Sequence, residues 1–219
     1  MGCFVTFEGV EGSGKTSLCK NVAEKLLARG FDVVLTREPG ATPLGAILRE
    51  LILDPSKPHP MPTAELFLFA ADRAQHVAEV IKPAFNRGAL ILCDRFVHST
   101  LAYQGYGRGL PLEQLRKLNE VASDGMMPST VLLLDLPAEA GLARASARSG
   151  TANPTAADGW NRFEADELAF HRKVRDGFLS LAKDPAERIQ KLDALRSQEE
   201  LLADVLRILE PELAKVKKK

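Results

Sequence analysis

The sequence has no excess of charge of either sign. Its 219 residues include 29 lysines and arginines and 29 aspartates and glutamates, so the formal net charge is zero. Domains whose main task is to bind nucleic acid usually carry a basic excess, because they must neutralise phosphates along a strand. The balance therefore argues against nucleic acid as a partner. The basic tail, Lys215 and Lys217–Lys219, is expected to be a solvated terminus.

The chain also lacks the long apolar runs that membrane-spanning helices and secretory signals require. Residues Met1–Thr6 match the loose pattern for N-terminal myristoylation. The same residues coincide with an apolar strand that the fold needs, so we set the lipidation pattern aside. We expect no membrane partner.

Cysteine is scarce. The three cysteines, Cys3, Cys19 and Cys93, are odd in number and their spacing matches no metal-binding motif. Cys3 and Cys93 lie in apolar runs, where a free cysteine behaves as a small apolar side chain. A reducing, cytoplasmic location is therefore the simplest expectation.

The stretch Gly9–Thr16 matches the pattern G-x-x-x-x-G-K-[ST] of a phosphate-binding P-loop. Its residues are Gly9, Val10, Glu11, Gly12, Ser13, Gly14, Lys15 and Thr16. Glycines let backbone N–H groups surround a phosphate chain, the lysine reaches the β- and γ-phosphates, and the threonine hydroxyl ligates Mg²⁺. An apolar strand precedes the loop and an amphipathic helix, Ser17 to Arg29, follows it. The loop therefore predicts a nucleoside triphosphate site.

Short apolar runs alternate with helical patterns along the whole chain. Strands are predicted at 3–7, 31–36, 89–93, 130–134 and 188–192. Such alternation indicates a parallel sheet with helices on both faces, and the length suits one domain. We therefore predict a single domain over residues 1–219. Its fold is α/β, of the P-loop NTPase type, with three α/β/α layers, a five-stranded parallel sheet and a mobile lid at about 144–162.

A long helix is predicted from Thr63, as its N-cap, to about Phe85. Phe69, Arg73 and His76 share one face of this helix, because they follow each other at i+4 and i+7. An aromatic ring beside a guanidinium can stack on a base and hydrogen-bond its edge. The same pattern is equally typical of core packing with a solvated arginine, and local sequence leaves both readings open.

Asp94 and Arg95 follow the buried run Ala89–Cys93. An acid at the tip of a buried strand beside a P-loop is suited to hold Mg²⁺ through water, and the arginine is suited to bidentate phosphate contact. Asp135 ends the next apolar strand and competes for the metal role. We favour Asp94 because Arg95 follows it.

Three further segments are candidates for ligand contact, each with a plain structural alternative. Arg37–Thr42 is a polar loop at the end of a strand, or a simple connecting turn. Ser99–Arg108 is a helix that lines a pocket, or a surface helix that ends at Gly105. Arg144 and Arg148, at i,i+4 before the small, polar segment Ser149–Asn161, could swing onto phosphates or remain ordinary surface arginines.

Taken in order, these segments resemble the bacterial thymidylate kinases. The resemblance extends from Phe4 to about Arg172. Its motifs are Phe7–Thr16, Arg37–Gly40, Leu68–His76, Asp94–Phe96 and Ser99–Gly105. It implies transfer of the γ-phosphoryl group of ATP to dTMP, with Mg²⁺ as cofactor and a homodimer as the assembly.

The resemblance also implies roles for individual residues. The acceptor-binding set is Glu11, Arg37, Glu38, Pro39, Arg49, Phe69, Arg73, Arg95, Ser99, Thr100, Tyr103 and Gln104. The catalytic set is Lys15, Arg95, Arg144 and Arg148, and the metal set is Thr16 and Asp94. Within these sets Phe69 stacks on thymine, Arg73 bonds the edge of the base, Arg95 binds the acceptor phosphate, and Glu11 lies near the 3′-hydroxyl. Family members whose P-loop lacks an arginine, as here, carry the transition-state arginines in the lid.

The sequence departs from the family pattern at a few positions. Ala41 stands where a second glycine is common, and Ser146 occupies a position that is often basic. Thr151–Trp160 resembles an insertion in the lid, and Asn161 begins a segment that more often starts with aspartate. These departures concern the lid and leave the reaction class unchanged.

Overall fold

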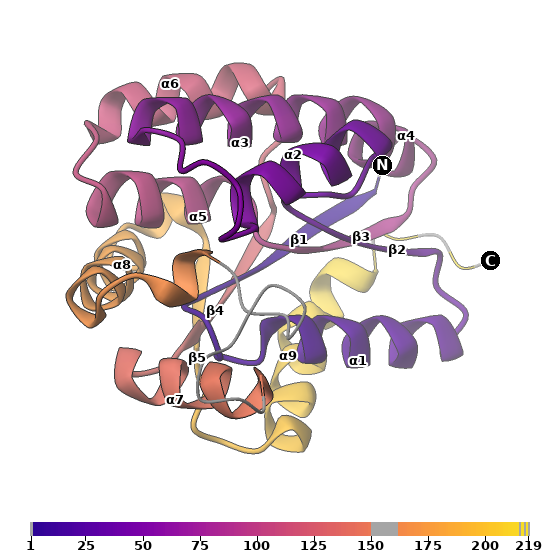
Figure 1. Cartoon of the computed structure of the whole chain (residues 1–219). Helices are drawn as coiled ribbons and strands as arrows, with labels where there is room; N and C mark the ends of the chain where they lie inside the picture. Colours follow the sequence, from indigo (N-terminus) through magenta and orange to yellow (C-terminus); the bar gives the residue numbers. More distant parts are fainter. Residues whose placement is uncertain (1, 150–161, 215, 217, 219) are drawn as a thin grey trace.

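A computed structural model of the chain describes residues 2–149, 162–214, 216 and 218, and for residues 148, 149, 164 and 165 the backbone alone. Five parallel strands form one sheet in the order β2–β3–β1–β4–β5, with helices on both faces (Figure 1). The predicted five-stranded parallel sheet and α/β fold are confirmed. The Thr151–Trp160 insertion lies outside the described residues, as does most of the predicted lid.

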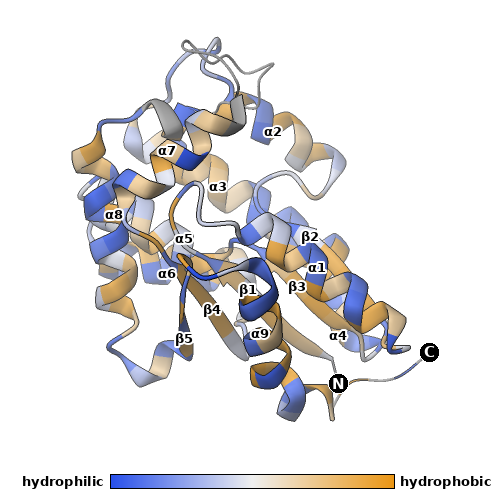
Figure 2. Ribbon diagram, turned by 90° about the horizontal axis from the view of Figure 1, so that it is seen from below, coloured by the Kyte–Doolittle hydropathy of each residue, from blue (hydrophilic) through white to orange (hydrophobic). Residues whose placement is uncertain are grey.

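The three central strands are buried on both faces, which explains why they read as continuous apolar runs. They are β1 (Cys3–Glu8), β3 (Leu90–Asp94) and β4 (Thr130–Asp135). The edge strands β2 (Val33–Arg37) and β5 (Ile189–Asp193) are partly exposed. In Figure 2 the central strands are accordingly the hydrophobic part of the ribbon.

Alternate residues of the strands point into two separate packing layers. Val5 and Leu92 pack with α1 (Lys15–Ala28) and α9 (Gln198–Leu213). Phe4 and Ile91 pack on the opposite face, against the segment Val77–Ala84. Because successive side chains of a strand point to opposite faces of the sheet, the same strands contribute to the hydrophobic packing on both faces.

The remaining helices complete the layers around the sheet (Figure 1). They are α2 (Pro43–Leu53), α3 (Pro62–His76), α4 (Lys82–Asn86), α5 (Val97–Thr100), α6 (Leu112–Ser123), α7 (Ala138–Ser149) and α8 (Leu168–Leu181). Short 3-10 segments lie at Arg162–Ala165 and Pro185–Glu187. Among the described residues, no helix is both long and apolar enough to cross a membrane.

Three helical segments differ in detail from the prediction. The helix expected from Thr63 to Phe85 is divided into α3, a π-helical segment (Val77–Ile81) and α4. Pro62, not a threonine cap, occupies the first turn, where its missing N–H costs nothing. Pro83, in the first turn of α4, has no N–H to donate to the carbonyl four residues earlier, so one α-helical hydrogen bond is missing where the π-helical segment passes into α4.

The other two differences lie beside the cavity described below. The sequence pattern from Phe163 to Ala182 predicts one helix, but this segment begins as a 3-10 turn and becomes α-helical only at Leu168. The segment after α5 is a π-helix, η2 (Leu101–Gly107), that ends two residues beyond Gly105. Tertiary contact determines the helix type of these two segments, since α8 packs against η2.

The strand register brings polar strand ends together. Asp94 is paired with Phe7 of β1 on one side and with Arg37 of β2 on the other. Because all strands run parallel, their carboxyl ends meet at one edge of the sheet, where open α/β sheets bind ligands. The P-loop follows β1 at this edge.

The P-loop packs directly on the backbone of α7. A Cβ atom on Gly12 would lie 2.1 Å from the carbonyl oxygen of Gly141, and a Cβ on Gly141 would lie 2.4 Å from that of Glu11. Real Cβ atoms do not approach oxygen so closely, so both positions need glycine. Gly141 was not singled out by the sequence, because a glycine inside a helix carries no local sign of such a contact.

This contact predicts the sign of a substitution. Helix propensity alone would make Gly141→Ala stabilising by about 1 kcal/mol. The contact with Glu11 instead makes it an overpacking change, and we expect net destabilisation of roughly 1–2 kcal/mol in urea unfolding. The exposed Ala143→Gly in the same helix is the control and should cost about 1 kcal/mol. Equal or greater stability of Gly141→Ala would show that the two backbones are not in contact.

Candidate active site

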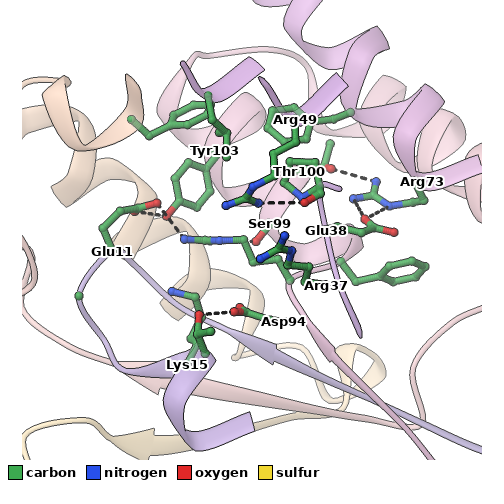
Figure 3. A pocket seen from close by; sticks show the side chains of 18 of the residues that line it. Glu11, Lys15, Arg37, Glu38, Arg49, Arg73, Asp94, Ser99, Thr100 and Tyr103 are labelled. Atoms are coloured by element: carbon green, nitrogen blue, oxygen red, sulfur yellow. Dashed lines mark hydrogen bonds and ion pairs between the residues drawn. The ribbon is translucent and has the colours of Figure 1, made fainter. Parts of the chain in front are cut away.

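A cavity of about 510 Å³ opens at the carboxyl edge of the sheet (Figure 3). Its lining includes Glu11, Gly12, Gly14, Lys15, Thr16, Arg37, Glu38, Pro39, Arg49, Phe69, Arg73, Asp94, Arg95, Ser99, Thr100, Tyr103, Gln104 and Arg144. These residues come from the P-loop, the ends of β2 and β3, and helices α2, α3, α5 and α7, with η2. Of the candidate residues in the P-loop, Gly9, Val10 and Ser13 do not line the cavity.

The P-loop is shaped for an anion. Gly14 is the N-cap of α1 with φ of 87°, and its position provides no side-chain cap for the first N–H groups of the helix. These N–H groups and the positive end of the helix dipole face the cavity side of the loop. Lys15 is buried, and its Nζ donates to the carbonyl of Val10 at 2.7 Å.

Burial first, and the nearby Arg95 second, lower the pKa of Lys15 to about 8. The carboxylates of Asp94 and Glu11 act in the opposite direction and offset only part of this effect. The lysine is therefore placed where a cation is costly unless further negative charge arrives. A phosphate chain in the loop would supply that charge.

Asp94 and Thr16 meet as the sequence predicts for a magnesium site. The Thr16 hydroxyl donates to Oδ2 of Asp94, and Oδ1 of Asp94 is buried without a hydrogen-bond partner in the described part of the chain. No cluster of three or more acidic, histidine or cysteine ligands exists among the described residues. One carboxylate and one hydroxyl suit a Mg²⁺ ion that keeps waters and phosphate oxygens as its other ligands.

Asp135, the alternative, is otherwise engaged. Its Oδ1 accepts from Nε of Arg175 at 2.7 Å. The preference for Asp94 over Asp135 therefore has a structural basis: one carboxylate oxygen is free of hydrogen bonds, whereas the other carboxylate is held in an ion pair.

Arg95 lies against Glu11 and Tyr103. Its guanidinium donates to Oε1 of Glu11 at 2.8 Å and to Oγ of Ser99 at 3.2 Å, and it lies 4.9 Å from the centre of the Tyr103 ring. The Tyr103 hydroxyl donates to the other oxygen of Glu11. Burial raises the pKa of Glu11, but Arg95 and Lys15 outweigh it and leave that pKa lowered.

Two more cations face the same space. Figure 3 shows Arg37 and Arg49 directed toward the centre of the cavity, opposite Lys15. Arg49 donates to the carbonyl of Pro39 at 2.9 Å, and its pKa is lowered by burial and then by the charge of Arg37. Like charges converge here, which is the expected electrostatic environment for a multiply charged anion.

Arg73 is fixed by a fully buried network. Its guanidinium donates to Glu38 at 2.9 Å, to Thr100 at 3.0 Å and to Oδ1 of Asn119 at 2.6 Å. His76, which shares a helix face with Arg73, pairs with the other oxygen of Glu38 at 2.9 Å. Arg73 is therefore not a solvated arginine, and the geometry leaves it at the wall of the cavity with little freedom to move.

Phe69 lines the cavity next to a ring that the sequence did not identify. Its centroid is 6.1 Å from that of Phe163, which also lines the cavity and stands edge-on to Tyr103 at 5.5 Å. Gln104 is buried and donates to Glu65 at 2.9 Å. This end of the cavity is aromatic with a few fixed polar groups, as a flat heterocycle requires.

The two predicted lid arginines have different outcomes. Arg144 lines the cavity and donates to the carbonyl of Ala194, which precedes α9, at 2.9 Å. Arg148 lies in α7, but its side chain is outside the described residues. Arg162 is buried, and one of its nitrogens donates to the carbonyl of Asp54 at 2.9 Å. The role of either lid arginine on phosphates stays a prediction.

Several supporting residues were missed. Glu8 is buried at the end of β1, where it accepts from the N–H of Phe96 at 2.8 Å and from the Ser99 hydroxyl at 2.6 Å. Asn119 of α6 holds Arg73, and Phe163 closes the aromatic end. An acid at the tip of a buried strand is a signal that could have drawn attention to Glu8. Asn119 and Phe163 have no such signal, since only the fold brings them to the site.

Comparison with known proteins agrees with this geometry. The family model described as thymidylate kinase matches residues 7–205. The thymidylate kinase of Nitratidesulfovibrio vulgaris is 48% identical over 204 residues, which cover 93% of this chain and 94% of the relative. That of Desulfovibrio desulfuricans is 51% identical over 199 residues, 91% of each protein. The crystal structure of thymidylate kinase from Ehrlichia chaffeensis superposes with a TM-score of 0.75 at 30% identity, covering 95% of this chain and 99% of that one.

The family model spans most of the chain, and the two relatives match more than nine-tenths of it at about half identity. All residues that line the cavity lie within the matched range 7–205. The chain belongs to the thymidylate kinase family.

Proposed function

We propose that this protein transfers the γ-phosphoryl group of ATP to dTMP, giving dTDP and ADP. The observation that carries the proposal is the single cavity that joins a P-loop to an aromatic end through a row of cations. The P-loop end suits a triphosphate, the aromatic end suits a base, and Arg95 lies between them. Family membership supports the same reaction.

The donor is bound at the P-loop. Lys15 and the N–H groups at the start of α1 contact the β- and γ-phosphates, while Thr16 and Asp94 hold Mg²⁺. The Oδ1 of Asp94, which has no hydrogen-bond partner among the described residues, supports this assignment. Bound there, Mg²⁺ neutralises charge on the phosphates and orients them.

The reaction needs no general base. The nucleophile is a phosphate oxygen of the acceptor, which is ionised at neutral pH. Catalysis therefore rests on positioning two anions against each other and on neutralising their charge. Arg95 and Lys15 are placed for this task, and Arg37 or Arg49 adds charge at the acceptor phosphate. Arg144 and Arg148 are the candidates for closing over the phosphates.

The base is read at the other end. Phe69 stacks on thymine and Arg73 bonds its edge, with Gln104 and Ser99 or Thr100 facing the ring. Arg73 is held by Glu38 and Asn119, so its orientation exists before the base arrives. This preorganisation reduces the entropy lost on binding.

The reaction is placed in the cytoplasm. Cys3, Cys19 and Cys93 are all buried and none of them forms a disulfide, which agrees with a reducing compartment.

We further infer a homodimer formed through α2 and α3, which pack together. Large apolar side chains are exposed on these two helices, including Ile47 at 67% and Phe67 at 58%, with Leu44 and Leu51 beside Ile47 along α2. An exposed apolar face of this kind marks an interface. A second copy of the chain is the occupant, because the same face on each copy is self-complementary across a twofold axis.

The acceptor panel is the decisive experiment. We expect purified protein with ATP and Mg²⁺ to convert dTMP far faster than AMP, GMP, CMP or thymidine, measured by coupled ADP release and confirmed by separation of dTDP. Preference for another acceptor would leave a nucleotide kinase of different specificity. Slow ATP hydrolysis that dTMP leaves unchanged would instead indicate a protein that uses ATP to switch a partner.

Lys15 should be essential for turnover. Lys15→Ala removes the cation that reaches the phosphates, so kcat should fall on the order of 10²-fold or more, with the folded state retained in circular dichroism. Lys20→Ala, at an exposed position of the same helix, is the matched control and should retain full activity. A Lys15→Ala enzyme of near-normal turnover would refute the role.

The dimer face predicts a change in mass. Ile47→Glu places a charge in the proposed interface, so light scattering during gel filtration should show half the mass of the parent protein at micromolar concentration. Leu27→Glu is the control, since Leu27 is also an exposed apolar side chain, at 46%, but lies on α1, away from α2 and α3. A parent protein that is already monomeric would disprove the interface.

A further inference from the structure

His171 is a buried histidine that the proposed mechanism does not use. It lies in α8, and the residue is only 1% exposed. Neither ring nitrogen has a hydrogen-bond partner within the part of the chain that the structure describes. The nearest acid is Glu11 of the P-loop, whose Oε2 is 4.0 Å from Nδ1 of His171.

This position is costly for an imidazole. A buried polar group without a partner loses roughly 1–3 kcal/mol of hydration that nothing replaces. The buried neighbours of His171 on α8, Phe170 and Val174, are apolar, so an apolar side chain could fill the same space without that cost. The arrangement is understandable if His171 gains a partner in a state other than the one seen here.

Glu11 is the group whose surroundings change when substrate binds. In this structure it is neutralised by Arg95 at 2.8 Å and accepts from the Tyr103 hydroxyl. In the proposed reaction Arg95 binds the acceptor phosphate. A dianionic phosphate and the Glu11 carboxylate then share one guanidinium, and each weakens the hold of the other.

Two charged side chains that follow His171 on α8 are already paired. Its neighbour Arg172 pairs with Glu139 of α7 at 2.6 Å, and Arg175, one turn further, pairs with Asp135 of β4 at 2.7 Å. On the η2 side, Tyr103 bonds to Glu11 itself. Beyond Glu11 stand the cations Lys15 and Arg95. Glu11 is therefore the anion that a charged His171 would meet.

We propose that His171 takes up a proton from solvent when the acceptor phosphate binds to Arg95, and then donates from Nδ1 to Glu11. The shift required is about 1 Å, from 4.0 Å to hydrogen-bond distance. Imidazole is the side chain whose ordinary range allows this charge change near neutral pH. His171 is thus a positioning residue: it keeps Glu11 in place while Arg95 turns to the phosphate. The inference rests on the proposed transfer to dTMP.

The proton uptake has a defined sign. A complex that binds more protons than the free partners becomes weaker as pH rises, so His171 should make dTMP binding less tight between pH 6.5 and 8.5. Ionisation of dTMP itself acts in the opposite direction and is the same for every variant. The difference between parent and His171→Gln therefore isolates the contribution of the histidine.

The test is calorimetric titration of dTMP at pH 7.5 in two buffers of different ionisation enthalpy, such as HEPES and Tris. The parent should take up several tenths of a proton more per site than His171→Gln, which can donate a hydrogen bond but cannot become charged. His59→Gln, at an exposed histidine, is the control and should match the parent. The KM for dTMP of His171→Gln relative to the parent should be raised at pH 6.5, roughly tenfold per unit by which the pKa rises on binding, and should approach the parent value at pH 8.5.

The outcomes separate this inference from the proposed function. Failure of the parent to bind or phosphorylate dTMP would overturn the function. Normal turnover of dTMP with equal proton uptake by parent and His171→Gln would overturn only the role of His171. If His171→Gln does not fold, imidazole NMR of the parent decides instead. The imidazole signal of one of the four histidines must then titrate at higher pH with dTMP bound, and this signal must be absent from the spectrum of His171→Asn. If no histidine signal shifts, or if the signal that shifts belongs to another histidine, the proposal is refuted.

Discussion

The organisation of this protein depends on positive charge gathered at the carboxyl edge of one parallel sheet. Lys15, Arg37, Arg49 and Arg95 face a common cavity, and the acids among them do not offset the whole cost. Burial first, and a neighbouring arginine second, lower the pKa values of Lys15 and Arg49. A folded protein tolerates such a cluster when its ligands are anions that complete the charge balance. Two phosphorylated substrates meeting end to end satisfy this requirement.

The sequence could predict everything that depends on local pattern. Apolar runs of strand length identified all five strands, and the glycine–lysine–threonine pattern identified the loop after β1. Parallel pairing then follows from alternation with helices, and it places Asp94 beside the P-loop without knowledge of any coordinate. Most candidate site residues therefore reached one cavity because each follows a strand or faces inward from a helix beside the strand ends.

What the sequence could not predict is contact between segments that are distant in the chain. Asn119 accepts a hydrogen bond from Arg73, which lies 46 residues away on a separate helix. Gly141 lies in a helix with ordinary sequence patterning, and its lack of a side chain leaves room for the backbone of the P-loop. Neither residue type is unusual in its local context. The π-helical segments and the 3-10 turn before α8 have the same cause, since tertiary packing and a single proline override helix propensity there.

The hydrogen bonds around Arg73 and those around Arg95 differ in how readily they can rearrange when a ligand binds. At the base end, every carboxylate and amide that holds Arg73 is buried and bonded, and rearranging such a network would leave unpaired groups in a medium of low dielectric. At the phosphate end, Arg95 is bonded to groups that it must share with an incoming dianion. Under the proposed roles, selection of the base relies on a fixed arrangement, whereas the phosphate is received by a cluster whose charges must be redistributed. His171 is buried 4.0 Å from Glu11 and has no hydrogen-bond partner in the described part of the chain, so it lies beside the cluster in which we propose that redistribution.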